Sequence, residues 1–218
     1  LLETGARVIA IEKDRELVPY LTELFKKEVQ AGQLTVIEAD ILDFDPKKHK
    51  LREGGYKLIA NIPYYITGAI FKKFLETSVQ PTQMVLLVQD EVAKRIVAKD
   101  NKESILSLSV QVFGKPRYVA KVSRGSFTPA PNVDSAILSI EEISKKSFTK
   151  DISEKMFFTL LHAGFAHKRK ILSANIQSFI PKDALLSIYR ELGLQETVRA
   201  EDIPLSKWLL LCKKIQTR

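Results

Sequence analysis

The feature that most constrains the fold of this chain is an unbroken apolar run, Met-Val-Leu-Leu-Val, at residues 84–88. Strands of a sheet that is covered by helices on both faces read as continuous apolar runs, whereas strands with one wet face alternate. Further strands are expected at residues 8–11, 34–37, 57–60, 117–122 and 135–140, the last two forming a hairpin. The sequence therefore predicts an α/β fold built on a doubly wound sheet.

Segments with helical spacing lie among these strands. Asp14 is expected to cap a helix whose apolar face runs from Leu17 to Phe25, and further helices are expected at residues 69–75, 91–98 and 104–113. After residue 143 a polar linker leads to segments with helical spacing alone, at 154–163, 168–179, 183–192 and 205–214. We predict two domains, a Rossmann-like sheet domain at residues 1–143 and an all-helical domain at residues 144–218.

The composition is that of a globular, basic protein. Lys and Arg total 34 against 26 Asp and Glu, which gives a net charge of +8 and favours a polyanionic partner such as nucleic acid, although excess lysine also serves solubility. The single cysteine, Cys212, excludes an internal disulfide and lies among apolar neighbours, as a buried thiol in a reducing compartment would. No apolar stretch approaches the roughly 20 residues that span a membrane, so we expect a soluble, cytoplasmic protein.

The tetrapeptide Asn61-Ile62-Pro63-Tyr64 follows the third predicted strand, residues 57–60. An amide oxygen and a rigid backbone carbonyl can accept hydrogen bonds from an exocyclic amino group, and a tyrosine ring offers a stacking face. Pro63 biases Ile62 toward extended geometry. Asn and Pro also mark ordinary turns, so the four residues alone leave a strand-ending turn and an amine-binding site both open.

Two acidic residues also follow predicted strands. Glu12 ends the first and Asp40 follows the second, and the carboxyl ends of strands are where open α/β sheets bind ligands. Glu12 could accept hydrogen bonds from ribose hydroxyls and Asp40 from an adenine amino group. Each residue taken singly is better explained as solvating a strand end. Their joint placement with Asn61 on one edge favours a nucleotide site.

Four motifs together resemble a known family: Ile11-Glu12-Lys13-Asp14, Glu38-Ala39-Asp40, Asn61-Ile62-Pro63-Tyr64, and the segment Phe127-Thr128-Pro129-Ala130-Pro131-Asn132-Val133-Asp134-Ser135. In that order they look like the ribosomal RNA adenine dimethyltransferases, over nearly the whole chain. Residues 89–95 and 168–170 are most similar to the bacterial small-subunit enzymes linked to kasugamycin sensitivity. The erythromycin-resistance methyltransferases of the large subunit match this middle stretch less well and remain an alternative.

The resemblance implies S-adenosylmethionine as methyl donor and an adenine amino group as acceptor. The implied donor contacts are Glu12, Lys13, Asp40, Ile41 and Asn61. The catalytic motif would be Asn61, Ile62, Pro63 and Tyr64, with Tyr64 and Phe127 contacting the target base. A phenylalanine between two strands is often simply core, so Phe127 keeps that alternative. Pro129 and Pro131 are expected to stiffen the loop that carries Phe127.

Basic residues supply candidates for RNA binding. We assign Lys94, Arg95, Arg124, and the predicted basic helix Lys168-Arg169-Lys170 to this role, and we interpret residues 47–50 as a solvated face. The partners implied by the resemblance are small-subunit ribosomal RNA and the assembling small subunit, bound by a monomer without membrane contact. The three histidines show no metal-ligand spacing with Cys212, so no metal is assigned.

One departure from the family concerns the start of the sequence. The glycine-rich loop that wraps the methionine end of the donor is missing, together with its strand, and residues 1–5 resemble the end of a helix closed by Gly5. We therefore expect the sequence to be a piece of a longer chain, with two exposed sheet edges and weak donor binding; micromolar calorimetric binding of S-adenosylhomocysteine would refute this. A catalytically silent RNA-binding or assembly factor on the same fold is the second functional hypothesis.

Overall fold

The computed structural model describes residues 1–217, which divide into two compact units, Leu1–Leu51 and the chain from Arg52 onward. In the first, the short 3-10 helix η1 (Leu2–Thr4) ends at Gly5, whose φ of 78° is left-handed, as predicted for a helix-closing glycine. Strands β1 (Val8–Glu12) and β2 (Leu34–Glu38) then pair in parallel, with Glu12 opposite Glu38.

Two helices connect β1 to β2, and they differ from the single helix that was expected. Helix α1 (Leu17–Leu24) begins three residues after Asp14, and Phe25 separates it from α2 (Lys26–Gln30). The Asp14 carboxylate accepts a hydrogen bond from the backbone N–H of Glu16 at 2.9 Å. This bond satisfies a donor just ahead of the helix, so Asp14 helps to start α1 without being its N-cap residue.

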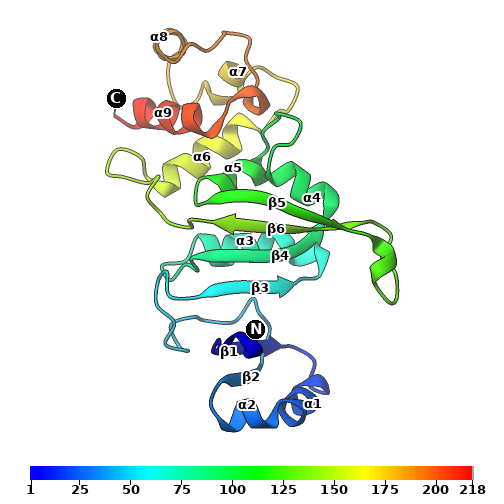
Figure 1. Ribbon diagram of the computed structural model, residues 1–218. Helices are drawn as coiled ribbons and strands as arrows, with labels where there is room; N and C mark the ends of the chain where they lie inside the picture. Colours follow the sequence, from blue (N-terminus) through cyan, green and yellow to red (C-terminus); the bar gives the residue numbers. More distant parts are fainter. Residues whose placement is uncertain (218) are drawn as a thin grey trace. The chain divides into compact units, whose positions relative to one another are not determined.

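The second unit contains a four-stranded sheet in the order β3-β4-β6-β5 (Figure 1). Strands β3 (Lys57–Asn61) and β4 (Gln83–Gln89) are parallel, while β6 (Ser135–Glu141) runs antiparallel to both β4 and β5 (Lys115–Val122). The predicted hairpin is therefore present. Strands β1 and β2 form a separate two-stranded sheet, so Glu12 and Asn61 end strands of different sheets, and the common edge of three polar tips expected from the sequence stays a prediction.

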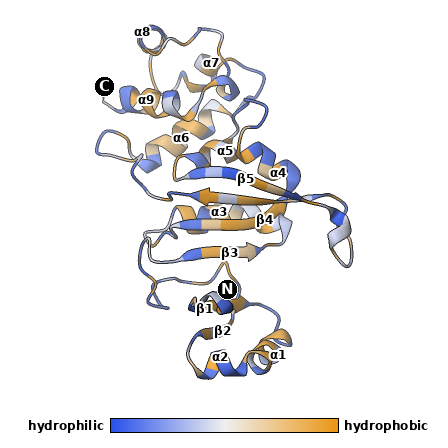
Figure 2. Ribbon diagram, in the orientation of Figure 1, coloured by the Kyte–Doolittle hydropathy of each residue, from blue (hydrophilic) through white to orange (hydrophobic). Residues whose placement is uncertain are grey.

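Strand β4 is the apolar run from which the α/β prediction began. Met84, Leu86 and Val88 are fully buried, whereas Val85 and Leu87 on the other face are only half-buried. The strand is thus fully covered on one face alone, which corrects the expectation of burial on both. Figure 2 shows hydrophobic residues along β6 and much of β4, with the edge strand β5 mostly hydrophilic.

Three helices accompany this sheet: α3 (Thr67–Leu75), α4 (Asp90–Ile96) and α5 (Ile105–Gln111). Helix α5 starts at a capping box in which Ser104 and Ser107 each accept a hydrogen bond from the other's backbone N–H. The core of this part is made by Ile70 and Phe74 of α3 with Leu108 of α5, all fully buried.

Helices alone follow β6 in the part of the chain that the structure describes, and in Figure 1 they lie beyond α5 from the sheet. They are α6 (Glu154–Gly164), α7 (Leu172–Ile176), α8 (Lys182–Leu192) and α9 (Leu205–Gln216), with a 3-10 turn η4 (Ala200–Asp202). Trp208, Tyr189 and Phe157 fill their core. Cys212 is fully buried there, as predicted, and burial raises the pKa of its thiol to about 11.

An aromatic cluster joins these helices to the sheet part. Phe113, after α5, packs edge-on against Phe148 and stacks on Phe158 of α6, and Phe157 packs edge-on against both Phe148 and Phe158. Aromatic pairs of this geometry stabilise beyond their buried area. The two parts accordingly fall into one compact unit, and the boundary at residues 143/144 stays a prediction.

The predicted basic helix at residues 168–170 is not helical. Helix α7 begins only at Leu172, whose backbone N–H donates to the Val198 carbonyl instead of to a residue of the same helix. Lys168, Arg169 and Lys170 are exposed on the preceding segment, which corrects the expectation of one helix from 168 to 179. In residues 1–217 no helix is long and apolar enough to cross a membrane.

Gly164 allows α6 and α9 to pack closely, which leads to a stability prediction. A Cβ at this position would overlap the Trp208 ring and lie 2.9 Å from Cδ1 of Leu172. We expect Gly164→Ala to destabilise the protein by about 1–3 kcal/mol, because overpacking outweighs the gain in helix propensity. Gly68→Ala in α3, where a Cβ meets nothing within 4 Å, is the matched control and should be neutral or stabilising. Urea unfolding of both variants measures the difference.

Candidate nucleotide and RNA site

The tetrapeptide Asn61-Ile62-Pro63-Tyr64 leaves β3 and turns into the 3-10 helix η2 (Tyr64–Ile66). Ile62 is buried and anchors the turn, and Pro63 holds an extended φ, ψ of −57°, 133°. Within the described chain, neither the carboxamide of Asn61 nor the carbonyl of Ile62 has a hydrogen-bond partner. Two acceptors at a rigid strand end are therefore left without a partner in the described chain, and they can accept hydrogen bonds from an amino group.

Tyr64 is fixed by a contact from a distant part of the sequence. Its hydroxyl lies 2.8 Å from Oγ of Ser135, the first residue of β6, which is fully buried. The Tyr64 carbonyl also accepts a hydrogen bond from the Thr67 hydroxyl at 2.9 Å. The hydroxyl of the ring and the backbone that carries it are thus both held, which lowers the entropy that a stacking contact would cost.

The segment between β5 and β6, which extends beyond the sheet in Figure 1, supplies the opposite wall. Phe127, Pro129 and Pro131 line a cleft of about 320 Å³ together with Asn61, Ile62, Pro63 and Tyr64. Phe127 is half-buried, so it is not a core residue. The structure therefore brings the predicted catalytic motif and the predicted base-contacting residues to one cleft, whose volume suits a single base.

Asp134 holds the start of that segment in place. Its carboxylate accepts from the backbone N–H of Arg124 at 3.0 Å and pairs with Lys121 at 2.7 Å. The Lys121 hydrogen bond, followed by the Arg124 backbone, holds the pKa of Asp134 below its usual value. Asp134 and Ser135 are adjacent in the sequence. One short segment therefore helps to position both the loop that carries Phe127 and the ring of Tyr64.

Asp90, at the start of α4, connects α4 to β5. Its carboxylate accepts from Nζ of Lys94 and from the hydroxyl of Tyr118, each at 2.6 Å, and its backbone N–H donates to the carbonyl of Asp134. The Lys94 bond, then the Tyr118 bond, holds the pKa of Asp90 below its usual value. In return, the bond to Asp90 raises the pKa of Tyr118 to about 12.

The predicted RNA-binding residues lie along two further depressions in the same unit. One, of about 440 Å³, includes Arg124 and Asn132; the other, of about 620 Å³, includes Lys94, Arg95 and Lys168, and Glu91 lines both. Asn132, which lines the first depression, follows the cleft-lining Pro131 in the sequence. Several of the cations are paired with acids, among them Arg95 with Glu91 at 2.8 Å. Arg169 and Lys170 are exposed but line neither depression.

The predicted donor contacts other than Asn61 lie in the first unit. One Glu12 oxygen accepts from the backbone N–H of Asp14 at 2.8 Å. Asp40 accepts from the backbone N–H of Leu42 and pairs with Lys13, both at 2.8 Å. The backbone N–H of Ile41 has no partner within residues 1–217. These four residues occupy the carboxyl ends of β1 and β2, where the parallel pair can present them to one ligand.

Comparison with known families decides to which protein family the chain belongs. The model of the ribosomal RNA adenine dimethylase family matches residues 1–217. The chain belongs to the ribosomal RNA adenine dimethylase family. This confirms the resemblance inferred from the motifs, and it identifies a methyltransferase on a Rossmann-like fold with a helical C-terminal part.

Sequence relatives of this dimethylase agree. The ribosomal RNA small subunit methyltransferase A of Dehalococcoides mccartyi (strain CBDB1) is 41% identical over 97% of this chain and 72% of its own. The protein of that name from Fusobacterium nucleatum subsp. nucleatum is 34% identical over 100% of this chain and 81% of its own. The solved structure of a Plasmodium falciparum dimethyladenosine transferase is 26% identical over 94% of this chain and 80% of its own, with a TM-score of 0.74. The 23S rRNA methyltransferase ErmE (TM-score 0.77, 22% identity, 96% and 82% coverage) shows the fold.

Two residues of this dimethylase that bear on the site were not found from the sequence. Ser135 was noticed only as the end of a motif, because its partner Tyr64 lies 71 positions earlier. Tyr65 follows the cleft-lining Tyr64 in the sequence and is 87% exposed. The doubled tyrosine was the only available signal, and large exposed aromatics often mark binding surfaces.

The Asp90–Tyr118 bond gives a titration prediction for the dimethylase. In Asp90→Asn the charged partner is lost, so the Tyr118 pKa should fall from about 12 toward its ordinary 10. Tyr56, whose pKa is raised to about 12 by burial alone, is the internal control and should not move. Because the folded-state pKa of Tyr118 is raised, its stabilising contribution is complete below about pH 10 and is lost as the pH rises through about 12. Ultraviolet titration of tyrosinate, with Tyr118→Phe to assign the signal, measures this.

Proposed function

We propose that this chain methylates the exocyclic amino group of adenines in small-subunit ribosomal RNA, twice on the same nitrogen, with S-adenosylmethionine as donor. The observation that carries the proposal is the cleft in which the unpaired Asn61 carboxamide and Ile62 carbonyl lie beside the rings of Tyr64 and Phe127. The small-subunit substrate is supported by the printed names of the sequence relatives. The same names favour it over a large-subunit substrate.

The main requirement on the cleft is to align the adenine amino nitrogen with the methyl group of the donor. The lone pair of an adenine amino nitrogen is delocalised into the ring, so the nitrogen is a weak nucleophile. Hydrogen bonds from its two N–H groups to the Asn61 oxygen and the Ile62 carbonyl would favour a more pyramidal nitrogen whose lone pair points at the methyl group. The nitrogen–carbon bond forms as the carbon–sulfur bond breaks, and the amino proton leaves to solvent.

Two rings can hold the base once it has left its stack. Each base–aromatic contact contributes about 1–3 kcal/mol, and extruding a base costs a few kcal/mol. Stacking on Tyr64 with contact from Phe127 therefore offsets the extrusion. The site must also accept a monomethylated nitrogen, and the open mouth of the cleft leaves room for the added methyl group.

The residues of the first unit fit the adenosine half of the donor. Glu12 has one carboxylate oxygen without a partner in the described chain, which suits a ribose hydroxyl. The unpaired N–H of Ile41 suits a ring nitrogen of adenine, and the Asp40 carboxylate can accept from the adenine amino group beside its bond to Lys13. The donor supplies an electrophilic methyl group when bound. Asn61 is proposed to contact both donor and target base.

The alternative of a silent RNA-binding factor uses the same depressions lined by Lys94, Arg95, Arg124 and Lys168. It is less well supported, because such a factor has no need of unpaired acceptors at the end of β3. We propose that the enzyme works as a monomer in the cytoplasm, where small subunits assemble. Sedimentation of the purified protein tests the oligomeric state.

The test is methyl transfer from labelled donor to small subunits that lack adenine dimethylation. We expect incorporation into the small-subunit RNA and dimethyladenosine in its nucleoside digest by mass spectrometry. Large subunits are the control and should remain unlabelled. Labelling of large subunits alone would move the enzyme to the erythromycin-resistance type, and tight RNA binding without any incorporation would support the silent factor.

The Tyr64–Ser135 bond makes a second test of the cleft. Tyr64→Phe and Ser135→Ala should each reduce methyl transfer about fivefold, since each removes one hydrogen bond of about 1 kcal/mol that orients the ring. The double variant should lose no more than either single, because both delete the same bond. Ser139→Ala is the matched control, another buried serine of β6, and should leave transfer unchanged. Multiplying effects in the double variant would show that Ser135 does not act through Tyr64.

A further inference from the structure

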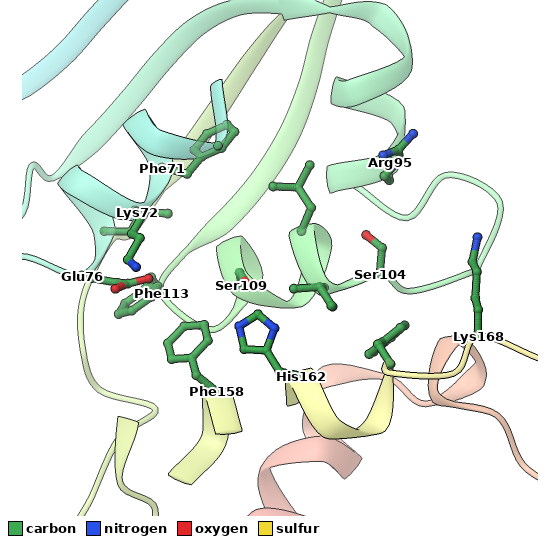
Figure 3. A pocket seen from close by; sticks show the side chains of 15 residues that line it. Phe71, Lys72, Glu76, Arg95, Ser104, Ser109, Phe113, Phe158, His162 and Lys168 are labelled. Carbon is green, nitrogen blue, oxygen red and sulfur yellow. The ribbon is translucent and has the colours of Figure 1, made fainter. Parts of the chain in front are cut away.

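A further cavity lies between α3, α5 and α6 (Figure 3) and, among residues 1–217, shares no lining residue with the base cleft. Its volume is about 590 Å³, which is within the range of small-ligand sites and larger than one nucleotide. Arg95, Ser104, Phe165 and Lys168 line both this cavity and the 620 Å³ depression. It is therefore the far end of the series of depressions that begins beside the base cleft.

One face of α6 presents flat rings to this cavity. Phe158, His162 and Phe165 recur at positions i, i+4 and i+7, which places them on the same side of a helix. In Figure 3 the side chains of Phe158 and His162 point from α6 into the cavity. Phe158 and Phe165 are half-buried and His162 is exposed, so parts of all three rings remain accessible. The back of Phe158 rests on Phe113 and that of Phe165 on Trp208, which keeps both rings in place.

Charge around the rings is positive. Lys72 of α3 and Lys168 after α6 line the cavity, and neither has an ion-pair partner within residues 1–217. Figure 3 shows them on opposite sides of the α6 rings. Arg95 adds a third cation, although Glu91 pairs with it. A polyanion that also has apolar flat faces would match both features at once.

Glu76 is the single acid in the cavity lining. It lies near Lys72 in Figure 3, and burial, the main cause, raises the pKa of its carboxyl. A carboxylate repels phosphate but accepts hydrogen bonds from amino groups. It therefore favours a ligand that turns an amino group of its base toward Glu76.

We propose that this cavity binds an unstacked nucleotide of the substrate RNA, with its base on the Phe158–His162–Phe165 face of α6 and its flanking phosphates at Lys72 and Lys168. The proposal rests on the proposed function, since it takes RNA as the substrate. Single-stranded nucleic acid is held in this way elsewhere, by aromatic faces for the bases and a positive groove for the backbone. The site would grip the RNA at a second point while the target adenine occupies the base cleft.

The first experiment measures RNA affinity. The probe is a fluorescein-labelled single-stranded RNA of roughly 12 nucleotides, and the readout is fluorescence anisotropy. We expect Phe158→Leu to weaken binding about tenfold, by loss of a stacking face, and Lys72→Gln to weaken it about threefold and to lower the slope of log affinity against log salt by about 0.7. Phe148→Leu, in the same aromatic cluster but outside the cavity, and Lys73→Gln, the neighbour of Lys72, are the matched controls and should bind as the unchanged protein does.

The second experiment locates the contact. RNA carrying 5-iodouridine is irradiated on the protein, and the adducts are mapped by mass spectrometry. An adduct on Phe158, His162 or Phe165 is expected, in addition to any on Tyr64, Tyr65 or Phe127. If Phe158→Leu fails to fold, the exposed His162→Ala replaces it. Adducts confined to the base cleft, or cavity variants that bind as tightly as their controls, would overturn the proposal.

Two further outcomes separate this inference from others. Adenosine monophosphate that, at micromolar concentration, prevents the α6 adduct from forming would make the cavity a site for free nucleotides, against the proposal. An α6 adduct in a protein that transfers no methyl group would leave the cavity assignment standing and remove the proposed function. Normal methyl transfer by a protein whose cavity variants bind RNA as tightly as their controls would leave the proposed function standing and remove the cavity assignment.

Discussion

Asn61→Ala should lower the rate of methyl transfer by about 10²–10³-fold, the range observed when one aligned polar group is removed from a catalytic site. The side chain has no partner within residues 1–217, so its removal breaks no internal bond and the free energy of unfolding should change by less than about 0.5 kcal/mol. Single-turnover incorporation of labelled methyl groups gives the rate, and urea unfolding gives the stability.

Asn61→Asp refines this result. The carboxylate keeps an acceptor oxygen but loses the amide donor, so a role in accepting a hydrogen bond from the adenine amino group predicts partial activity, above that of Asn61→Ala. RNA affinity should be unchanged in Asn61→Ala, because the amide carries no charge that contacts phosphate. Wild-type rates in Asn61→Ala would remove the mechanism, whereas equal losses of rate and RNA affinity would make Asn61 a binding residue.

Tyr64→Ala is expected to have the second largest effect, a loss of about 10–100-fold in transfer. The substitution removes a stacking face worth about 1–3 kcal/mol and leaves the buried hydroxyl of Ser135 without its partner. Tyr64→Phe retains the ring and should lose only about fivefold. The large gap between the two variants, measured with the same small-subunit substrate, is the signature of stacking.

A substrate with a more accessible base provides the control for Tyr64. If the ring offsets the cost of extrusion, a short single-stranded RNA, whose bases are already unstacked, should be less sensitive to Tyr64→Ala than the folded small-subunit RNA. Equal sensitivity of both substrates would assign the ring to orientation of the bound base. No loss with either would show that the cleft is not the base site.

Much of the base cleft could be predicted from the sequence because its chemistry is local. A strand that ends in Asn61 followed by Pro63 has a rigid exit wherever it is placed in a sheet, and the prolines near Phe127 mark a stiff segment that cannot continue a strand. The alternation of strand and helix patterns likewise predicted all six strands, since periodicity depends on neighbouring residues alone.

What could not be predicted depends on contacts between distant residues. Ser135 bonds to Tyr64 across 71 positions, and no spacing rule connects them. The run Lys168-Arg169-Lys170 looked helical, yet the start of α7 is set by a hydrogen bond from Leu172 to Val198. Strands β1 and β2 form a sheet of their own, a matter of strand pairing that an apolar pattern does not encode. The spacing likewise predicts α6 as a helix but does not predict that its rings line a cavity.

The aromatic cluster of Phe113, Phe148, Phe157 and Phe158 has a consequence for substrate choice. A hinge at this junction would let the C-terminal helices swing, and the enzyme could then reach adenines at many separations from wherever those helices touch the ribosome. Interlocked rings remove that freedom. The C-terminal helices would then stay at a fixed distance from the base cleft. An adenine would be modified because it lies at that distance from the point where the helices bind, whatever the sequence of the neighbouring bases.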